Sequence, residues 1–345
     1  MWLLSAIVVK RHIKNEMIHM DKRTPTVSVI VPNYNYACYL EERLFSILNQ
    51  TFQDFELIFL DDASTDQSVE VLNRYKDNLH VSHIVVNEKN TGSPFRQWMK
   101  GILLAKGEWI WIAEADDLCE PDFLETCLEQ VRLYPDVSVC MAASRFINEK
   151  GEVLQAEANY WGKKKPKEPA RCFSGKEYAE RNMYWNNCVI NASGVLFRRS
   201  YALCLSHSIF LNMRYSGDWV FWFQMLLQGD MVEVYRELNY FRQHTLKVSM
   251  EGINTGNRIK EDIDTYVLME NTFPHIKSYK RRLAHGMLYR KVKKLRNKEK
   301  QEELSRYLLE QLGGKASDLR LFHMNQYVRW IFPWIITVSR DRIKK

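Results

Sequence analysis

Three kinds of signal are absent from this sequence of 345 residues. Its seven cysteines are scattered and form no CxxC pair, which argues against a disulfide framework or a zinc site and favours a reducing compartment. The apolar stretches near the two ends are too short to cross a bilayer. No nucleic-acid-binding motif of recognisable spacing is present. We therefore expect a cytoplasmic protein with no nucleic-acid partner.

Composition and length place the chain among ordinary globular proteins. Hydrophobic residues make up 46% of the sequence and charged residues 26%. The net charge of +7 is modest and fits a surface that meets phosphates or anionic lipid. At this length, one large domain, or one domain and a half, is expected.

The amino-terminal part of the chain alternates between strand patterns and helix patterns. Strand patterns cover 26–35, 55–60, 80–90 and 108–113. Such alternation predicts a parallel α/β sheet, whose ligands lie beyond the carboxyl ends of the strands. Polar clusters stand at those ends, at 32–35, 61–66, 87–92 and 114–117. The sequence therefore predicts one site built from four strand ends, with Ser64 and Gln67 spaced as a capping box for the second helix.

Two long segments carry a family resemblance. They read VSVIVPNYNYACYLEERLFSILNQTFQDFELIFLDDASTD, residues 27–66, and NTGSPFRQWMKGILLAKGEWIWIAEADD, residues 90–117. In order and spacing they resemble the nucleotide-sugar-binding half of the family 2 inverting glycosyltransferases, and the likeness extends over roughly 26–245. The resemblance implies the GT-A fold, a Rossmann-like, mostly parallel central sheet flanked by helices.

The resemblance over 26–245, and the helical and basic pattern from about 257, suggest how the chain divides. Residues 1–25 form an amino-terminal extension, and 26–245 form the GT-A domain. Within that domain, 26–118 is the nucleotide-sugar-binding half and 119–245 the acceptor half. Residues 246–345 form a helical, basic carboxy-terminal region.

The acids that end the fourth strand suggest a metal site. A diphosphate leaving group develops negative charge, so a divalent cation with oxygen ligands, Mg²⁺ or Mn²⁺, is its natural partner. By resemblance, Asp117 would ligate the metal and Asp116 would contact the ribose. Glu114 stands where the family more often has Asp, and we expect it to play a supporting or conformational role. The alternative is that these acids cap the helix that follows.

Four further residues are expected on the donor side by resemblance. Asp62 would accept a hydrogen bond from the nucleobase, Tyr34 would stack on the base, and Pro32 would line the same pocket. Arg96 would lie near the diphosphate. The alternatives are core packing for Tyr34, a turn acid or helix cap for Asp62, and a solvated charge for Arg96.

An inverting transfer needs a base that takes the proton of the acceptor hydroxyl. Asp218, at the start of a strongly apolar helix, resembles the family's catalytic Asp, although Gly217 stands where the family more often has Glu. The alternative for Asp218 is a helix N-cap. By resemblance, His244 would reach the metal or the diphosphate, its alternative being a solvated loop residue. Ser193 lies in a segment that resembles the acceptor side.

The last 20 residues, QYVRWIFPWIITVSRDRIKK, mix aromatic and basic side chains. That mixture suits the surface of an anionic bilayer, so we expect peripheral contact with the inner face of the membrane. The alternative is a terminal helix docked on the catalytic domain.

Together these features predict a metal-dependent inverting glycosyltransferase. It would move a sugar from a nucleotide sugar, a UDP sugar in our interpretation, to a glycan or lipid-linked acceptor of a surface polysaccharide or O-antigen. A nucleotidyltransferase would also gather acids around a metal, but the stretch PNYNYACYL after the first strand lacks its Gly-rich loop. A non-catalytic glycan- or nucleotide-binding relative is the third alternative.

Overall fold

The computed structural model describes residues 24–156, 158–159, 166–244, 252, 255–314 and the single positions 318, 327 and 331. Most of the expected amino-terminal extension and nearly all of the expected membrane-contacting tail lie outside these residues. None of the helices in the described ranges is long and apolar enough to span a membrane.

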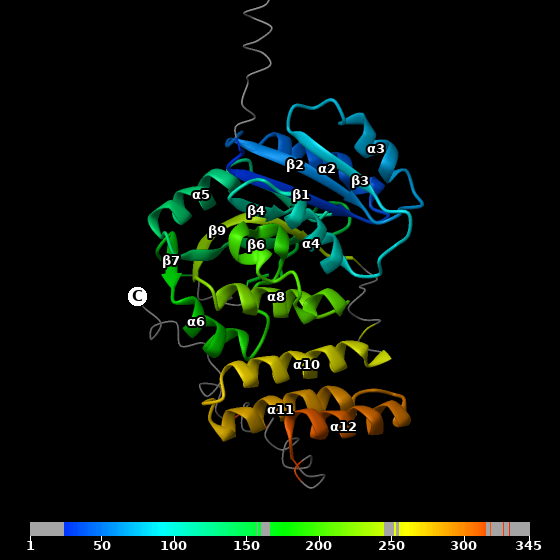
Figure 1. Ribbon diagram of the computed structural model, residues 1–345, viewed down its shortest axis with the longest axis vertical. Coiled ribbons are helices and arrows are strands. Elements are labelled where there is room, and N and C mark those ends of the chain that lie inside the picture. Colours follow the sequence, from blue (N-terminus) through cyan, green and yellow to red (C-terminus); the bar gives the residue numbers. More distant parts are fainter. Residues whose placement is uncertain are drawn as a thin grey trace, which may run out of the picture.

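The amino-terminal half has the expected strand–helix alternation. Its strands are β1 (Val27–Asn33), β2 (Phe55–Asp61), β3 (Val81–Val86) and β4 (Trp109–Ile112), and its helices are α2 (Ala37–Leu48), α3 (Ser68–Arg74) and α4 (Pro94–Leu104). β1 pairs in parallel with β2 and β4, and β2 pairs in parallel with β3. The carboxyl ends of these strands therefore meet at one edge of the sheet (Figure 1).

The second half continues the same sheet with mixed pairing. It comprises β5 (Leu118–Cys119), α5 (Phe123–Leu133), β6 (Val137–Ile147), β7 (Ala170–Phe173), α6 (Gly175–Tyr178), η1 (Ala179–Met183), η2 (Ala192–Gly194), β8 (Val195–Arg198), α7 (Arg199–Leu203), η3 (Ile209–Asn212), α8 (Gly217–Leu226) and β9 (Asp230–Arg242). The sheet of the described residues runs β3-β2-β1-β4-β8-β6-β9-β5, with β7 on β9. β8 is antiparallel to β4 and β6, whereas β6 and β9 are parallel. The expected parallel arrangement thus holds for the first four strands, and the remainder is mixed.

Both faces of the sheet are buried. In β1, Val27, Val29 and Val31 pack on the side of α2 and α5, while Ile30 packs on the side of α4 and α8. This alternation follows from the pleat, which sends successive side chains to opposite faces. Continuous apolar strands are the usual consequence of helices on both faces.

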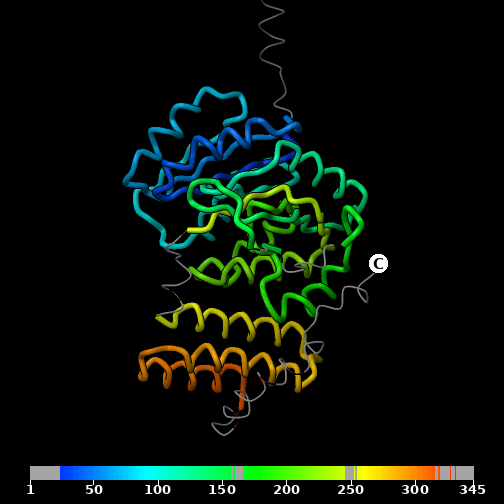
Figure 2. The backbone as a smooth tube through the Cα atoms, turned by 180° about the vertical axis from the view of Figure 1, so that it is seen from behind, coloured from blue at the N-terminus to red at the C-terminus, as the bar shows by residue number. Residues whose placement is uncertain are grey.

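Three helices follow the sheet: α10 (Asn257–Thr272), α11 (Ser278–Lys293) and α12 (Lys298–Leu312). Figures 1 and 2 show them stacked below α8, with α10 facing the sheet domain and the other two beyond it. Their buried residues, such as Ile263, Tyr266 and Leu304, join the apolar cluster that also contains Trp219 of α8. The helical carboxy-terminal region is therefore packed against the α8 side of the sheet.

Candidate active site

Polar side chains from successive strand ends meet in hydrogen bonds. Asn33, at the end of β1, donates to Asp61 Oδ2 of β2 at 2.7 Å. Asn87, after β3, donates to Asp62 Oδ1 at 2.7 Å. Asp61 also accepts from the hydroxyl of Ser64, at 2.7 Å. The structure thus joins the predicted clusters of β1, β2 and β3 into one polar rim.

The three acids after β4 are held in different ways. Asp117 is 1% exposed, and its two oxygens accept from Asn191 Nδ2 at 2.7 Å and from the backbone N–H of Arg242 at 2.8 Å. Glu114 accepts from the indole N–H of Trp98 at 2.9 Å. Asp116 lies 2.6 Å from His244 Nε2. Capping of α5 does not account for these contacts, because that helix begins only at Phe123.

Burial and mutual repulsion make these acids weak. Burial, and then the charge of Asp116, raise the pKa of Glu114 to about 8 and that of Asp117 to about 7. The guanidinium of Arg43, 4.9 Å from the ring centre of Trp111, acts in the opposite direction on both pKa values. Such a cluster of carboxyl groups favours the approach of a further cation.

One short segment links this cluster to Asp218. Asn187 donates to Asp218 Oδ2 at 2.9 Å, and Asn191, four residues later, donates to Asp117. Four residues span at most about 14 Å of extended chain. The hydroxyl of Ser193, further along the segment, accepts from the backbone N–H of Glu114 at 3.0 Å. Residues 187–193 therefore bind both Asp218 and the acids that follow β4.

Asp218 lies in the first turn of α8 and is partly buried. Burial raises its pKa to about 6, and its Oδ1 accepts from the N–H of Trp219 at 2.8 Å. The N-cap position of α8 is Ser216, so Asp218 is not the cap. A Cβ atom at Gly217 would lie 2.4 Å from the ring of Phe95, so a larger residue would not fit at this position without a shift of that ring.

His244 is brought to Asp116. Their hydrogen bond raises the pKa of the imidazole, and the ring stacks on Tyr36 at 5.6 Å. The neighbouring Arg242 is 2% exposed, and its Nε donates to the backbone oxygen of Asp116 at 2.6 Å. Arg242 and His244, at the end of β9 and just after it, thus bind Asp116 and Asp117. The role of His244 toward a metal stays a prediction.

The four donor-side residues have different environments. Pro32 is buried within β1, and Tyr34 is 45% exposed, which leaves its ring open for stacking. Asp62 accepts from Thr91 and Gln97 as well as from Asn87, so its carboxylate holds the loop after β3. Arg96 is exposed and donates to the backbone oxygen of Leu211 at 3.2 Å. Their contacts with a nucleotide sugar stay predictions.

The donor atoms of the cluster suit a hard divalent cation. Within the part of the chain that the structure describes, no group of three or more His, Cys, Asp or Glu side chains is arranged to hold a metal ion. Mg²⁺, however, is commonly held by one or two carboxylates together with substrate phosphates and water. Burial and the charge of Asp116 raise the pKa values of Glu114 and Asp117, and a bound cation would act in the opposite direction. The residues therefore fit a cation that is shared with a diphosphate.

Several partners in this site were not predicted from the sequence. Trp98, Asn187 and Asn191 hold the three carboxyl groups of Glu114, Asp218 and Asp117. They stand 16, 31 and 74 positions from the acids that they bind, and no pattern in the sequence links the members of these pairs. The one available signal was the polar stretch NNCVIN, residues 186–191, within otherwise apolar surroundings.

The comparisons with known proteins assign the family. The model described as Glycosyl transferase family 2 matches residues 28–205, which is more than half of the chain. The chain belongs to this family. It therefore carries a glycosyltransferase domain, and the resemblance noted in the sequence is confirmed.

Curated relatives match shorter stretches. Glycosyltransferase GlyG of Streptococcus pneumoniae serotype 4 is 39% identical over 108 residues, which are 31% of this chain and 35% of GlyG. Chondroitin synthase of Escherichia coli is 31% identical over 140 residues, 40% of this chain and 20% of the synthase. The matched part is thus well under two thirds of the length of either relative.

A solved structure matches nearly the whole fold. S. aureus TarS 1-349 in complex with UDP has a TM-score of 0.55 at 16% identity, over 88% of this chain and 91% of that one. Identity this low bears on the fold alone. The expected GT-A fold, with its helical carboxy-terminal region, is confirmed.

Proposed function

We propose that this protein is a metal-dependent inverting glycosyltransferase that moves a sugar from a UDP sugar to a glycan or lipid-linked acceptor in the assembly of a surface polysaccharide. The observation that carries the proposal is the pair of bonds from Asn191 to Asp117 and from Asn187 to Asp218. Through these bonds one short segment, 187–191, contacts both the proposed metal ligand Asp117 and the proposed base Asp218. The UDP complex of TarS and the polysaccharide synthase among the relatives support the choice of donor and product class.

In this proposal the donor lies along the ends of β1 to β4. Tyr34 offers an exposed ring to the base, with Pro32 beside it. Asp116 binds the ribose, and Asp62 keeps the loop after β3 in place. Arg96 stands on the exposed side of α4, where it would reach the diphosphate.

A divalent cation, Mg²⁺ or Mn²⁺, would be held by Asp117 and by His244, which lies beside Asp116. The cation would supply positive charge to the leaving diphosphate. The chain's own residues meet two requirements for this. Asn191 and the N–H of Arg242 orient the carboxyl group of Asp117. Because Asp117 is buried, water screens its charge little, and the carboxylate would interact strongly with a cation bound there.

Asp218 is the proposed base. Its carboxylate takes the proton of the acceptor hydroxyl while that oxygen forms a bond to the anomeric carbon, and the bond from this carbon to the diphosphate breaks. A pKa of about 6 leaves most of the carboxyl group ionised at neutral pH and still basic enough to accept the proton. Because the acceptor attacks opposite the leaving group, the anomeric configuration inverts.

The test is a panel of UDP sugars incubated with the protein, with Mn²⁺ or with EDTA, and UDP release as the readout. One or a few of the sugars should release UDP in the presence of Mn²⁺, and release should rise when a glycan acceptor is added. In the same panel Asp218→Asn should release little UDP, and its matched control is Asp264→Asn on α10, whose side chain pairs with Lys260. Equal UDP release with EDTA would refute the proposed metal dependence. No release from any sugar would refute the proposal that the donor is a UDP sugar.

The domain division stays part of the proposal. β9 ends at Arg242 and α10 begins at Asn257, so residues 26–245 would form the GT-A unit and 246–345 the helical region. Expression of 26–245 alone, followed by circular dichroism and thermal unfolding, tests whether this unit folds without the helices.

A further inference from the structure

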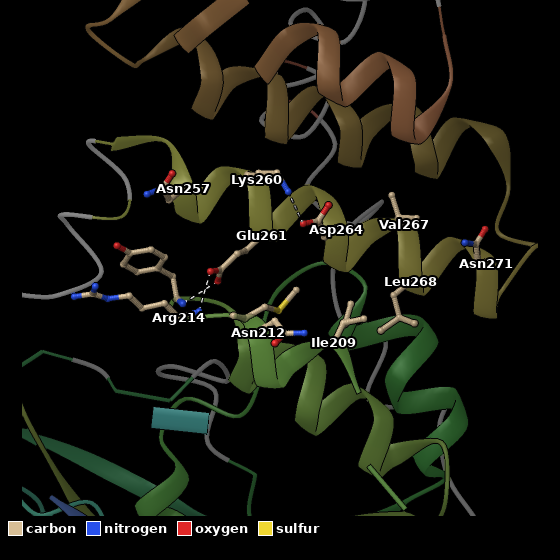
Figure 3. Close-up of a pocket in the computed structure, with 12 residues that line it drawn as sticks. Ile209, Asn212, Arg214, Asn257, Lys260, Glu261, Asp264, Val267, Leu268 and Asn271 are labelled. Atoms are coloured by element: carbon tan, nitrogen blue, oxygen red, sulfur yellow. Dashed lines mark hydrogen bonds and ion pairs between the residues drawn. The ribbon is translucent and has the colours of Figure 1, made fainter. Parts of the chain in front are cut away.

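The loop that leads into α8 is bound by one side chain of α10. Glu261 accepts from three consecutive backbone N–H groups: Arg214 donates to Oε1, and Tyr215 and Ser216 donate to Oε2, each at 2.8 Å. Figure 3 shows Glu261 pointing from α10 toward Arg214, in a groove of about 770 Å³. Hydrogen bonds to an ionised carboxylate are among the stronger ones in proteins. They fix the backbone immediately before the turn that carries Asp218.

The next residue of α10 binds the same loop. Asp262 is 2% exposed, and its Oδ1 accepts from the hydroxyl of Ser216 at 2.8 Å. Its Oδ2 accepts from Lys291 of α11, also at 2.8 Å. Ser216 is therefore held twice, through its N–H by Glu261 and through its hydroxyl by Asp262.

The opposite side of the turn is equally confined. Gly217 packs so closely against Phe95 of α4 that a Cβ atom there would lie 2.4 Å from the ring. Asn187 binds the carboxyl group of Asp218 from another segment. The turn that carries Asp218 is therefore in contact with α4, with Asn187 and, through 214–216, with α10.

We propose that Glu261 and Asp262 are positioning residues for the transfer reaction: by binding 214–216 they hold Asp218 in place, so that the carboxy-terminal helices are required for catalysis. This inference rests on the proposed role of Asp218 as base. It predicts a defect in the chemical step rather than in donor binding, because the proposed donor residues lie in β1, shortly after β1, β2 and β4, or on α4, and none belongs to the loop at 214–216.

The charges of α10 also face Asp218. Arg258 lowers the pKa of Asp218 and Asp262 raises it, while burial has the largest effect. Hydrogen bonds from the amide of Asn187 and from the N–H of Trp219 also lower this pKa. Two substitutions on one helix should thus move the acidic limb of the pH profile in opposite directions.

A matched control is available on the same helix. Asp264 pairs with Lys260 and accepts from the hydroxyl of Tyr307 on α12, so it contributes to helix packing without touching the loop at 214–216. Asp264→Asn removes a polar contact of α10 comparable to the one that Asp262→Asn removes. Ser216→Ala removes the bond to Asp262 from the side of the loop and leaves α10 unchanged.

The first experiment measures the contact without relying on activity. Backbone amide exchange is followed by mass spectrometry in the full chain for the wild type, Glu261→Gln and Asp264→Asn. A glutamine has one acceptor oxygen where the carboxylate has two, so amides of 214–216 should exchange faster in Glu261→Gln and at the wild-type rate in Asp264→Asn. Unchanged exchange in Glu261→Gln would overturn the inference.

The second experiment separates kcat from binding. Glu261→Gln should lower kcat about tenfold to a hundredfold, since small displacements of a catalytic group cost that much, while the Kd for UDP stays within about twofold. Ser216→Ala and Asp262→Asn should lower kcat to a smaller and similar extent, with the acidic limb of Asp262→Asn moved to lower pH and that of Arg258→Gln to higher pH.

The outcomes separate the two proposals. A wild type that turns over no UDP sugar refutes the proposed function, and the positioning role falls with it even if exchange shows the contact. An active wild type with unchanged kcat in Glu261→Gln and Ser216→Ala refutes the positioning role alone. An equal loss of kcat in Asp264→Asn assigns the effect to helix packing and also refutes it.

Discussion

Replacement of Asp218 by asparagine should lower activity and, at neutral pH, favour folding. The pKa of Asp218 is about 6 in the folded protein against the ordinary 3.8, so ionisation of this group opposes folding at pH values above 6. The difference corresponds to at most about 3 kcal/mol. Because the side chain keeps part of its contact with water, we take about half, roughly 1.5 kcal/mol.

The pH dependence isolates this energy. The opposing contribution is fully present above pH 6, shrinks as the pH falls through 6, and is absent below 3.8, where both states are protonated. The bond that Asn187 donates to Oδ2 favours the ionised form of Asp218 and is therefore already included in its pKa. The free energy of unfolding of Asp218→Asn minus that of the wild type should therefore be about 1 kcal/mol larger at pH 7.5 than at pH 4, so the variant gains stability relative to the wild type as the pH rises.

Urea unfolding at the two pH values, followed by tryptophan fluorescence, measures this difference. In parallel, kcat at pH 7.5 should fall about 10²- to 10⁴-fold, the usual contribution of general base catalysis. The wild-type kcat/KM should itself decline as the pH falls through about 6. A relative stability that does not depend on pH, or a variant that retains wild-type kcat, would contradict the assignment of Asp218 as an ionised, buried base.

Three other predictions concern binding. Asp117→Ala should abolish Mn²⁺-dependent binding of UDP in calorimetry, and undiminished binding would remove the metal assignment. Tyr34→Ala should weaken UDP binding by about 1–3 kcal/mol if its exposed ring stacks on the base, whereas Tyr34→Phe should bind as the wild type does; equal affinities of all three would refute stacking. Deletion of 320–345 should reduce sedimentation with anionic vesicles, and equal sedimentation would leave the tail without a membrane role.

The strands that form the site were predictable because each is a local pattern. β1, β2 and β4 are short apolar runs followed at once by polar residues, and the parallel pairing brings those residues to one edge. A prediction from local sequence that was wrong is the capping box of Ser64 and Gln67. The hydroxyl of Ser64 instead binds Asp61, and α3 begins at Ser68 with Gln67 as its N-cap.

The remainder of the site depends on contacts between distant segments. Asn191 reaches Asp117 across 74 positions, and Glu261 reaches Ser216 across 45. No periodicity links such pairs, since each depends on how β8, β9 and α10 pack on the first four strands. The contact of α10 with the loop at 214–216 could not be predicted for this reason, although the helix itself was expected from its composition.

The most direct test of the central claim is the anomeric configuration of the product. The reaction would be run with an α-linked UDP sugar that the panel identifies, and the new glycosidic linkage would be assigned by proton NMR from its anomeric coupling. A base at Asp218 acting opposite the diphosphate predicts a β-linked product, with one UDP released for each linkage formed. An α-linked product would contradict a single displacement at this site.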